Sequence, residues 1–413
     1  MIGRPARPAT MAGVATAQAS HRRSASLDGL RALAALSVLA FHVWLYRDDR
    51  PKSGRRPELL DAILFEANLG LVCFFVLSGY LLYRSFARAA LAGGTRVATR
   101  RYAVRRAARI LPAYYACLAG CLVLYALFGP HNITPTVGEM PLFVVLGQNY
   151  SSATIMQLNP VTWTLVVEAA FYILLPLLGL LVLRLAPRRA WAQVAMIGVL
   201  IAISVAWNGL AYHHGWSPLV KKLLPGFLGA FGAGMLVAVW IEWRRIARPP
   251  REGGHDGLGP WATGALALLG TLVVFGDGYW SETVDGGNDA RAMFAMLMPA
   301  AGFALIVAAI AGGRGRAVHW LGWRPLAAVG LVSYGLYLWH LPLLLVLRGQ
   351  GLLPQALWPR MLVVLVAALV AATLSWRFVE KPAMAWAARR ERARTVGAAP
   401  ARPGQPVVEA APS

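Results

Sequence analysis

Long apolar segments, separated by short polar ones, run along most of the chain. Ten of them are long enough to cross a bilayer as helices, which takes roughly 17–25 mostly apolar residues. These segments lie near 28–46, 67–86, 110–128, 161–183, 191–211, 223–243, 261–276, 291–312, 325–347 and 358–379. The pattern predicts an all-α polytopic membrane protein with about ten transmembrane helices.

An eleventh apolar segment, 136–149, is shorter and contains Pro141. Irregular backbone at membrane depth survives only where protein buries it or where it lines a wet cavity. We therefore expect 136–149 to form a re-entrant or interfacial element, and whether it spans the membrane is left open.

Composition and charge support the membrane interpretation. Of the 413 residues, 58% are hydrophobic and only 14% are charged, whereas a soluble domain usually carries about 25% charged residues. The net charge is +22, and ten spans starting in the cytoplasm place 28 of the 40 Lys and Arg residues inside and 8 outside. The positive-inside rule therefore explains the basicity and argues against nucleic-acid binding. It predicts a multi-pass membrane protein with both termini in the cytoplasm, and we expect the membrane to be a bacterial cytoplasmic (inner) membrane from the resemblance given below.

The same pattern divides the chain into three parts. We expect a basic cytoplasmic tail over 1–26, a membrane domain over 27–382, and a cytoplasmic tail over 383–413 that is first basic and then disordered. The three cysteines all lie in predicted spans, and their spacing indicates neither a disulfide framework nor a metal site.

Ionisable residues inside predicted spans are candidate functional groups because burying them is costly. Arg31 and His42 are eleven residues apart in the first span, close to three helical turns, so they share one face and differ in depth by roughly 16 Å. Arg31 is expected near the cytoplasmic surface and His42 in the outer half. The simpler alternatives are a snorkelling anchor for Arg31 and a histidine bonded to a nearby carbonyl for His42.

Two further spans carry polar groups at similar depth. Glu168 lies in the fourth span between Trp163 and Tyr172, and a buried carboxylate needs a partner. The alternatives are a structural ion pair for Glu168 and an aromatic belt for Trp163. In the ninth span one helical face carries three polar residues, which could also serve only to hydrogen-bond neighbouring helices together. They are Ser333, Tyr337 and His340.

An arginine-rich segment precedes the third span. If it is helical, Arg105 and Arg109 share a face and Arg106 lies beside them. Guanidinium groups suit phosphate, so the cluster is a candidate cytoplasmic anion site. A membrane anchor obeying the positive-inside rule would have the same composition.

At these residues the chain resembles the acyltransferase-3 family of integral-membrane O-acyltransferases. The resemblance extends from about Leu27 to Pro382 through six pieces in family order. They are Leu27–Arg31 with His42, Phe74–Tyr80 including Ser78, Arg105–Pro112, Trp163 with Glu168 and Tyr172, Ser333–His340, and Glu380–Pro382.

The resemblance implies transfer of an acyl group, often acetyl, from acyl-CoA to a hydroxyl, without a metal. Family acceptors include cell-surface polysaccharides, lipid-linked glycans, peptidoglycan sugars and macrolides. By motif position, Arg31 and His42 match the family's essential pair, and Arg106 and Arg109 match its donor-binding arginines. Some relatives carry a fused soluble domain, but this chain ends about 30 residues after Pro382, so we expect none here.

The chemistry fits the residues. His42 would act as general base for the hydroxyl, with Glu168 or a tyrosine orienting its ring. Arg31 would stabilise the oxyanion or steer the pantetheine arm of the donor. Arg105, Arg106 and Arg109 would hold the phosphates of coenzyme A in the cytoplasm. The supporting residues would be Ser78, Trp163, Tyr172, Ser333, Tyr337 and His340. Direct attack in a ternary complex and an acyl-histidine intermediate both remain open.

Other functions are also compatible with the sequence. The first choice of acceptor is a cell-envelope glycan or glycolipid, and the second is the sugar of a secondary metabolite such as a macrolide. A proton-coupled transporter or flippase would also carry intramembrane His, Glu and Arg, although no convincing internal repeat relates the two halves. A membrane scaffold would use the same polar residues only as glue between helices.

Overall fold

A computed structural model describes residues 11–47, 59–94, 97, 99–247, 257–283, 294, 296–313 and 316–397. Within these ranges the chain is almost entirely helical and contains no strand. The predicted all-α class is therefore confirmed. The main helices are α1 (Met11–Leu45), α2 (Leu59–Glu66), α3 (Gly70–Leu91), α4 (Thr99–Phe128), α5 (Met140–Val144), α6 (Trp163–Leu185), α7 (Ala190–His213), α8 (Pro218–Lys221), α9 (Leu228–Ala247), α10 (Pro260–Thr283), α12 (Leu297–Gly312), α13 (Arg316–His319), α14 (Arg324–Leu331), α15 (Ser333–Gly349), α16 (Leu357–Ser375) and α17 (Lys381–Gly397).

Seven helical segments among the described residues are long and apolar enough to cross a membrane, and the bent pair of α14 and α15 can form an eighth. Two shorter apolar helices, Pro260–Gly276 and Leu297–Gly312, lie at two more of the predicted spans. The multi-pass helical architecture therefore holds, and the exact count of ten stays a prediction.

The ninth predicted span, 325–347, is not one continuous helix. It is bent by 70° between α14 and α15. The backbone N–H of Val332 donates to the carbonyl of Val329, a tight bond of the kind that closes a helix. A side chain at Gly330 would meet the backbone of Asp28, so α14 lies directly against α1.

The short segment 136–149 contains α5, a helix of five residues, and the start of a 3-10 turn over Gln148–Tyr150. The Glu139 carboxylate accepts bonds from the backbone N–H and hydroxyl of Thr136, at 2.7 and 2.9 Å. The hydroxyls of Tyr114 and Tyr115 donate to the last carbonyls of α5, both at 2.8 Å. The element is therefore held against α4 and is too short to span a bilayer.

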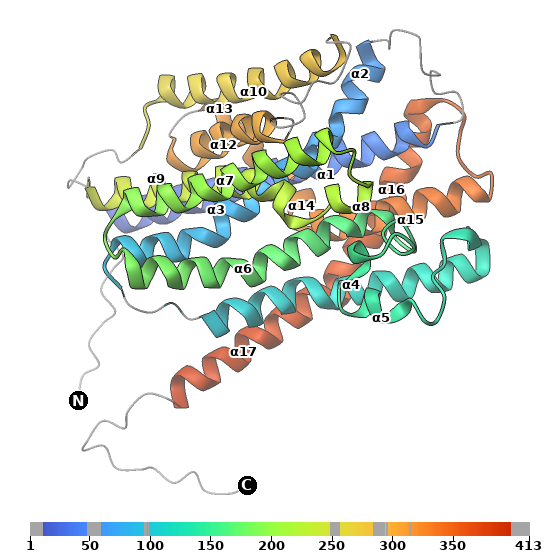
Figure 1. Cartoon of the computed structure of the whole chain (residues 1–413), viewed down its shortest axis with the longest axis horizontal. Coiled ribbons are helices and arrows are strands. Elements are labelled where there is room, and N and C mark those ends of the chain that lie inside the picture. Colours follow the sequence, from blue (N-terminus) through green and yellow to red (C-terminus); the bar gives the residue numbers. More distant parts are fainter. Residues whose placement is uncertain are drawn as a thin grey trace, which may run out of the picture.

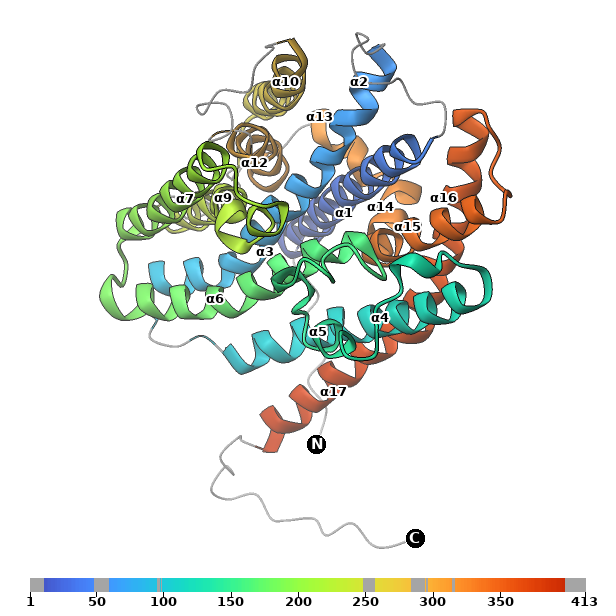
Figure 2. The same cartoon turned by 45° about the vertical axis from the view of Figure 1, so that its right-hand side comes forward.

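The helices lie side by side in one bundle (Figures 1 and 2), and their buried apolar side chains form two main hydrophobic clusters. One cluster is built mainly from α3, α6, α9 and α12, and the other from α1, α4, α15 and α16. Phe74 packs against both. The two clusters therefore meet beside α3, and the site described below lies at this junction.

The crossing of α3 and α9 depends on two glycines. A Cβ atom at Gly79 would meet the carbonyl of Phe231, and one at Gly234 would meet the carbonyl of Val76. Close backbone approach through small residues is a common way for helices to pack in membranes. The crossing places α9 directly against α3, whose side chains form part of the cavity wall.

The two predicted tails lie partly in the described residues. α1 begins at Met11, inside the predicted 1–26 tail, and α17 extends through Gly397, inside the predicted 383–413 tail. α17 packs along α4, where the Glu391 carboxylate pairs with Arg101 and Arg105 at 3.1 and 2.8 Å. Residues 398–413 lie outside the described residues.

Candidate active site

A cavity, part of it open to the surroundings, lies where α1, α3, α4, α6 and α15 meet. Apolar side chains of α3 form much of the wall. The polar lining residues are Arg31, Ser78, Arg106, Arg109, Thr164, Glu168, Tyr172, Ser333, Tyr334 and Tyr337.

Glu168 is the carboxylate of this cavity. Its Oε1 accepts a hydrogen bond from the Ser78 hydroxyl at 3.1 Å, and its Oε2 accepts one from the Tyr172 hydroxyl at 2.8 Å. Tyr172 lies one turn further along α6, and Ser78 faces it from α3. Both carboxylate oxygens are thus satisfied, as a buried acid requires.

Three guanidinium groups share the cavity with Glu168. Arg31 Nη1 lies 3.8 Å from Oδ1 of Asp28, and Arg31 Nε is buried with no hydrogen-bond partner among the described residues. The guanidinium of Arg106 lies 5.9 Å from the ring centroid of Tyr172. The three guanidiniums outnumber the two nearby carboxylates, Asp28 and Glu168, by one positive charge. This excess charge and the unsatisfied N–H donor of Arg31 are features expected of an anion-binding site.

His42 lies against His340 beyond the cavity. His42 Nδ1 is 2.9 Å from the carbonyl oxygen of Val38 and 3.2 Å from His340 Nε2, while His340 Nδ1 is 3.2 Å from the carbonyl oxygen of Leu336. These contacts assign a proton to Nδ1 of each ring, because a carbonyl can only accept. His42 Nε2 is then left with its lone pair, as a general base requires.

Tyr337 joins the histidines to the cavity. Its side chain lines the cavity, and its ring centroid lies 5.8 Å from that of His340. Its hydroxyl donates to the carbonyl of Val161 at 3.0 Å and lies 2.7 Å from the hydroxyl oxygen of Thr164. The cavity and the histidine pair are therefore neighbouring compartments with Tyr337 between them.

Most of the residues singled out from the sequence meet at this site. Arg31, Ser78, Arg106, Arg109, Glu168, Tyr172, Ser333 and Tyr337 line the cavity, and His42 pairs with His340. Glu168 bonds to Ser78 and Tyr172, whereas His340 is the ring that contacts His42. The ring beside His42 is therefore that of His340, and which group orients His42 during the reaction stays a prediction.

Two of the predicted residues lie elsewhere. Arg105 is not among the cavity-lining residues, and its Nε donates to Glu391 on α17. Trp163 packs against Phe227 with ring centroids 5.4 Å apart. The Lys222 ammonium lies 5.3 Å from the Trp163 ring centroid, and burial lowers the pKa of Lys222.

Two polar residues of the cavity, Thr164 and Tyr334, were not predicted as site residues from the sequence. Thr164 is one turn before Glu168 on α6, a spacing that could have identified it. Tyr334 donates its hydroxyl to the carbonyl of Ile110 at 3.0 Å, and no spacing rule predicts that contact. Within the described residues, no group of three or more His, Cys, Asp or Glu side chains could hold a metal ion.

Fold and site together define a multi-pass helical membrane protein with a cationic internal cavity beside a histidine pair. The family model described as "Acyltransferase domain" matches residues 24–377. The chain belongs to this family, the acyltransferase-3 family that its motifs resemble.

Curated relatives carry related names. The chain is 28% identical over 392 residues to the "Putative peptidoglycan O-acetyltransferase YrhL" of Bacillus subtilis, covering 88% of the chain and 55% of the relative. It is 24% identical over 390 residues to "Peptidoglycan O-acetyltransferase OatA" of Listeria monocytogenes, covering 89% and 57%. It is 25% identical over 387 residues to "O-acetyltransferase OatA" of Staphylococcus aureus, covering 88% and 57%. The chain thus spans a little over half the length of these relatives. No solved structure matches it.

Proposed function

We propose that the protein is a membrane-embedded O-acyltransferase that moves an acyl group, most simply acetyl, from cytoplasmic acyl-CoA to a hydroxyl of a cell-envelope glycan. The family assignment and the names of the relatives support acyl transfer and a glycan acceptor. The observation that carries the proposal is the cavity that combines three guanidiniums with one carboxylate inside a bundle of membrane-spanning length.

The cavity suits the donor. Coenzyme A carries several phosphate charges, and arginine forks bind phosphate with charge-assisted, often bidentate hydrogen bonds. Arg106 and Arg109 lie near the start of α4, in the part of the chain that the positive-inside rule places in the cytoplasm. Under the proposal they hold the phosphates, and the pantetheine arm extends toward Arg31 and Ser78.

The histidine pair suits the acceptor side. In direct attack, the acceptor oxygen bonds to the thioester carbonyl carbon, His42 Nε2 takes the hydroxyl proton, and the proton passes to the thiolate as the carbon–sulfur bond breaks. Arg31 Nε, buried with no hydrogen-bond partner among the residues that the structure describes, would steer the pantetheine arm from the cavity toward His42, because its depth on α1 differs from that of His42 by roughly 16 Å. An acyl-histidine intermediate would use the same His42 Nε2 as nucleophile. Either route brings the thioester past Tyr337.

The protein would lie in the membrane so that donor and acceptor reach it from opposite sides. The apolar helices and the distribution of basic residues support a multi-pass membrane protein with both termini in the cytoplasm, and the bacterial sources of the relatives support a bacterial inner membrane. The donor would then enter near Arg106 and Arg109, and the acceptor would approach from the outer half near His42. Peptidoglycan is the first acceptor to test, because the relatives' names state it.

The test uses inside-out membrane vesicles that contain the full-length protein and envelope glycan. We expect radiolabel from acetyl-CoA to enter the glycan and to be released as acetate by mild base. Arg106→Ala should lower the incorporation at least tenfold, while Arg184→Ala, at an exposed arginine of α6, should leave it unchanged. Labelled glycan at equal levels with empty-vector vesicles would contradict the proposal.

A further inference from the structure

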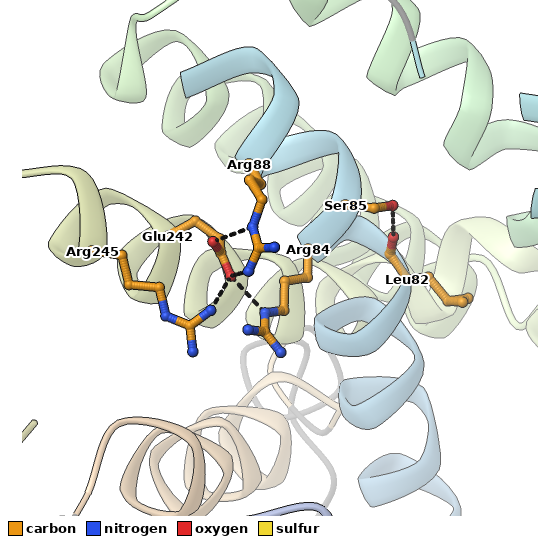
Figure 3. Close-up of polar contacts among 6 residues, drawn as sticks. All are labelled: Leu82, Arg84, Ser85, Arg88, Glu242 and Arg245. Carbon is orange, nitrogen blue, oxygen red and sulfur yellow. Dashed lines mark hydrogen bonds and ion pairs between the residues drawn. The ribbon is translucent and has the colours of Figure 1, made fainter. Parts of the chain in front are cut away.

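A second charged cluster lies away from the cavity, at the ends of α3 and α9 (Figure 3). Glu242, on α9, is only 2% exposed. Its Oε1 accepts from Arg84 Nε at 2.5 Å and from Arg245 Nη1 at 3.0 Å, and its Oε2 accepts from Arg88 Nε at 2.9 Å. We call these four residues the Glu242 cluster. None of them lines the cavity.

The cluster holds more positive charge than its carboxylate neutralises. One glutamate faces three arginines, which leaves two positive charges in excess. Each guanidinium has five N–H donors, and the bonds to Glu242 use only Nε of Arg84, Nε and Nη2 of Arg88, and Nη1 of Arg245. The guanidinium nitrogens outside these bonds form no hydrogen bond within the described residues. The arginine side chains are 32%, 59% and 40% exposed, so these donors are accessible.

A role in helix packing does not account for this excess. α3 and α9 already pack closely through Gly79 and Gly234, and a single arginine would neutralise Glu242. Instead, Glu242 holds three partly exposed guanidiniums side by side (Figure 3), and it uses only some of their donors. That is a preorganised site for a multidentate oxyanion such as phosphate.

Position favours a lipid as the source of the phosphate. Arg88 lies in the last turn of α3, and Arg245 lies in the last turn of α9. Both helices belong to segments of membrane-spanning length, Leu59–Leu91 and Leu224–Ala247, so their ends lie at headgroup depth. Trp243 and Ile246 are 48% and 49% exposed in the same last turns of α9, as in an interfacial belt that contacts lipid.

We propose that the Glu242 cluster binds the phosphate of an anionic phospholipid headgroup. Arg88 and Arg245 supply the charge for the phosphate, and Glu242 keeps the three guanidiniums together when the lipid is absent. A lipid bound at this site would hold the ends of α3 and α9 to the membrane surface. Because the lipid would bind only the folded protein, it would also raise the free energy of unfolding by mass action. The proposal does not depend on the acyl donor or acceptor.

The experiment follows thermal unfolding of the full-length protein in nanodiscs of phosphatidylcholine alone or mixed with phosphatidylglycerol. We expect phosphatidylglycerol to raise the melting temperature. The variant Arg88→Gln/Arg245→Gln, which keeps the Arg84–Glu242 pair, should lose at least half of that rise. The matched control Arg184→Gln/Arg189→Gln removes two exposed arginines of α6 and the α6–α7 loop and should keep it. An equal rise in wild type and in Arg88→Gln/Arg245→Gln would overturn the proposal.

Two further measurements complete the test. Inorganic phosphate added to phosphatidylcholine nanodiscs should give no rise, and a rise matching that with phosphatidylglycerol would overturn the lipid assignment in favour of a soluble anion. Glu242→Gln leaves three guanidiniums without their carboxylate, so it should melt lower in phosphatidylcholine and regain stability in phosphatidylglycerol more than wild type does. If the variant Arg88→Gln/Arg245→Gln does not fold, the response of the melting temperature of Glu242→Gln to phosphatidylglycerol tests the proposal instead. The failure of Glu242→Gln to respond to phosphatidylglycerol would mean that the cluster is only a structural clamp.

Discussion

Replacing His42 and His340 one at a time separates a catalytic base from its orienting partner. His42→Ala removes the ring whose Nε2 carries the available lone pair. His340→Phe keeps a ring of similar size but removes the Nε2 that lies 3.2 Å from His42 Nδ1. The Val38 carbonyl, 2.9 Å from the same Nδ1, still holds His42 in the second variant.

The two substitutions should differ clearly in magnitude. A general base contributes about 10²- to 10⁴-fold to rate, and His42→Ala should lose an effect of that size. One hydrogen bond contributes about 0.5–1.5 kcal/mol net, which corresponds to roughly 2- to 13-fold in rate. His340→Phe should therefore lower activity about 2- to 13-fold.

The assay measures acetate released by mild base from the envelope glycan of cells that make each variant as their only acyltransferase of this family. Immunoblots of the membranes match protein levels, and His131→Ala, at an exposed histidine of the loop after α4, is the control. If His42→Ala keeps more than half of the wild-type acetate, His42 is not the base. If His340→Phe loses as much as His42→Ala, His340 does more than orient its partner.

The packing and the arginine assignment give two more predictions. Gly79→Ala and Gly234→Ala should each lower the melting temperature in detergent, because the new methyl meets a carbonyl of the facing helix and overpacking costs about 1–3 kcal/mol. Gly198→Ala, where a Cβ meets no atom within 4 Å, should leave it unchanged or raise it, and the reverse order would refute the packing argument. In an acetyl-CoA binding titration, Arg106→Ala should weaken binding at least tenfold and Arg105→Ala less than twofold. Equal losses would mean that the cavity is not the donor site.

The helical membrane class could be predicted from sequence because its signal is local. Runs of apolar residues must cross a bilayer of known thickness, and their lengths can be counted. The break between α14 and α15 leaves no such signal, because the apolar segment continues on both sides of it and Ser333 and Tyr334 are the only polar residues beside Val332. It depends on the close fit of Gly330 against Asp28, which only the packed structure reveals.

Residues of the site could be identified singly, but their partners could not. Helical spacing placed Arg105 and Arg109 on one face, yet α4 turns Arg106 and Arg109 into the cavity while Glu391 holds Arg105 outside. The choice between these faces depends on where α17 packs. Likewise His42 and His340 are 298 residues apart, and no spacing rule links them.

Both halves of the Glu242 cluster are recognisable in the sequence as charged residues at the ends of apolar segments. Glu242 lies at the end of the predicted span 223–243, where a carboxylate needs partners. Arg84 and Arg88 stand one helical turn apart at the end of another apolar segment. Sequence alone could have identified each half, while the approach of α3 to α9 through Gly79 and Gly234 is what joins them.

The most direct test of the proposed donor site is thermal unfolding of the detergent-purified protein with acetyl-CoA, dephospho-CoA analogues and longer acyl-CoAs. We expect acetyl-CoA to raise the melting temperature of wild type by mass action. Arg106→Ala and Arg109→Ala should lose the rise, and His42→Ala should keep it. A folded protein whose melting temperature responds to none of these thioesters would contradict the account, and a transporter would then become the leading interpretation of the cavity.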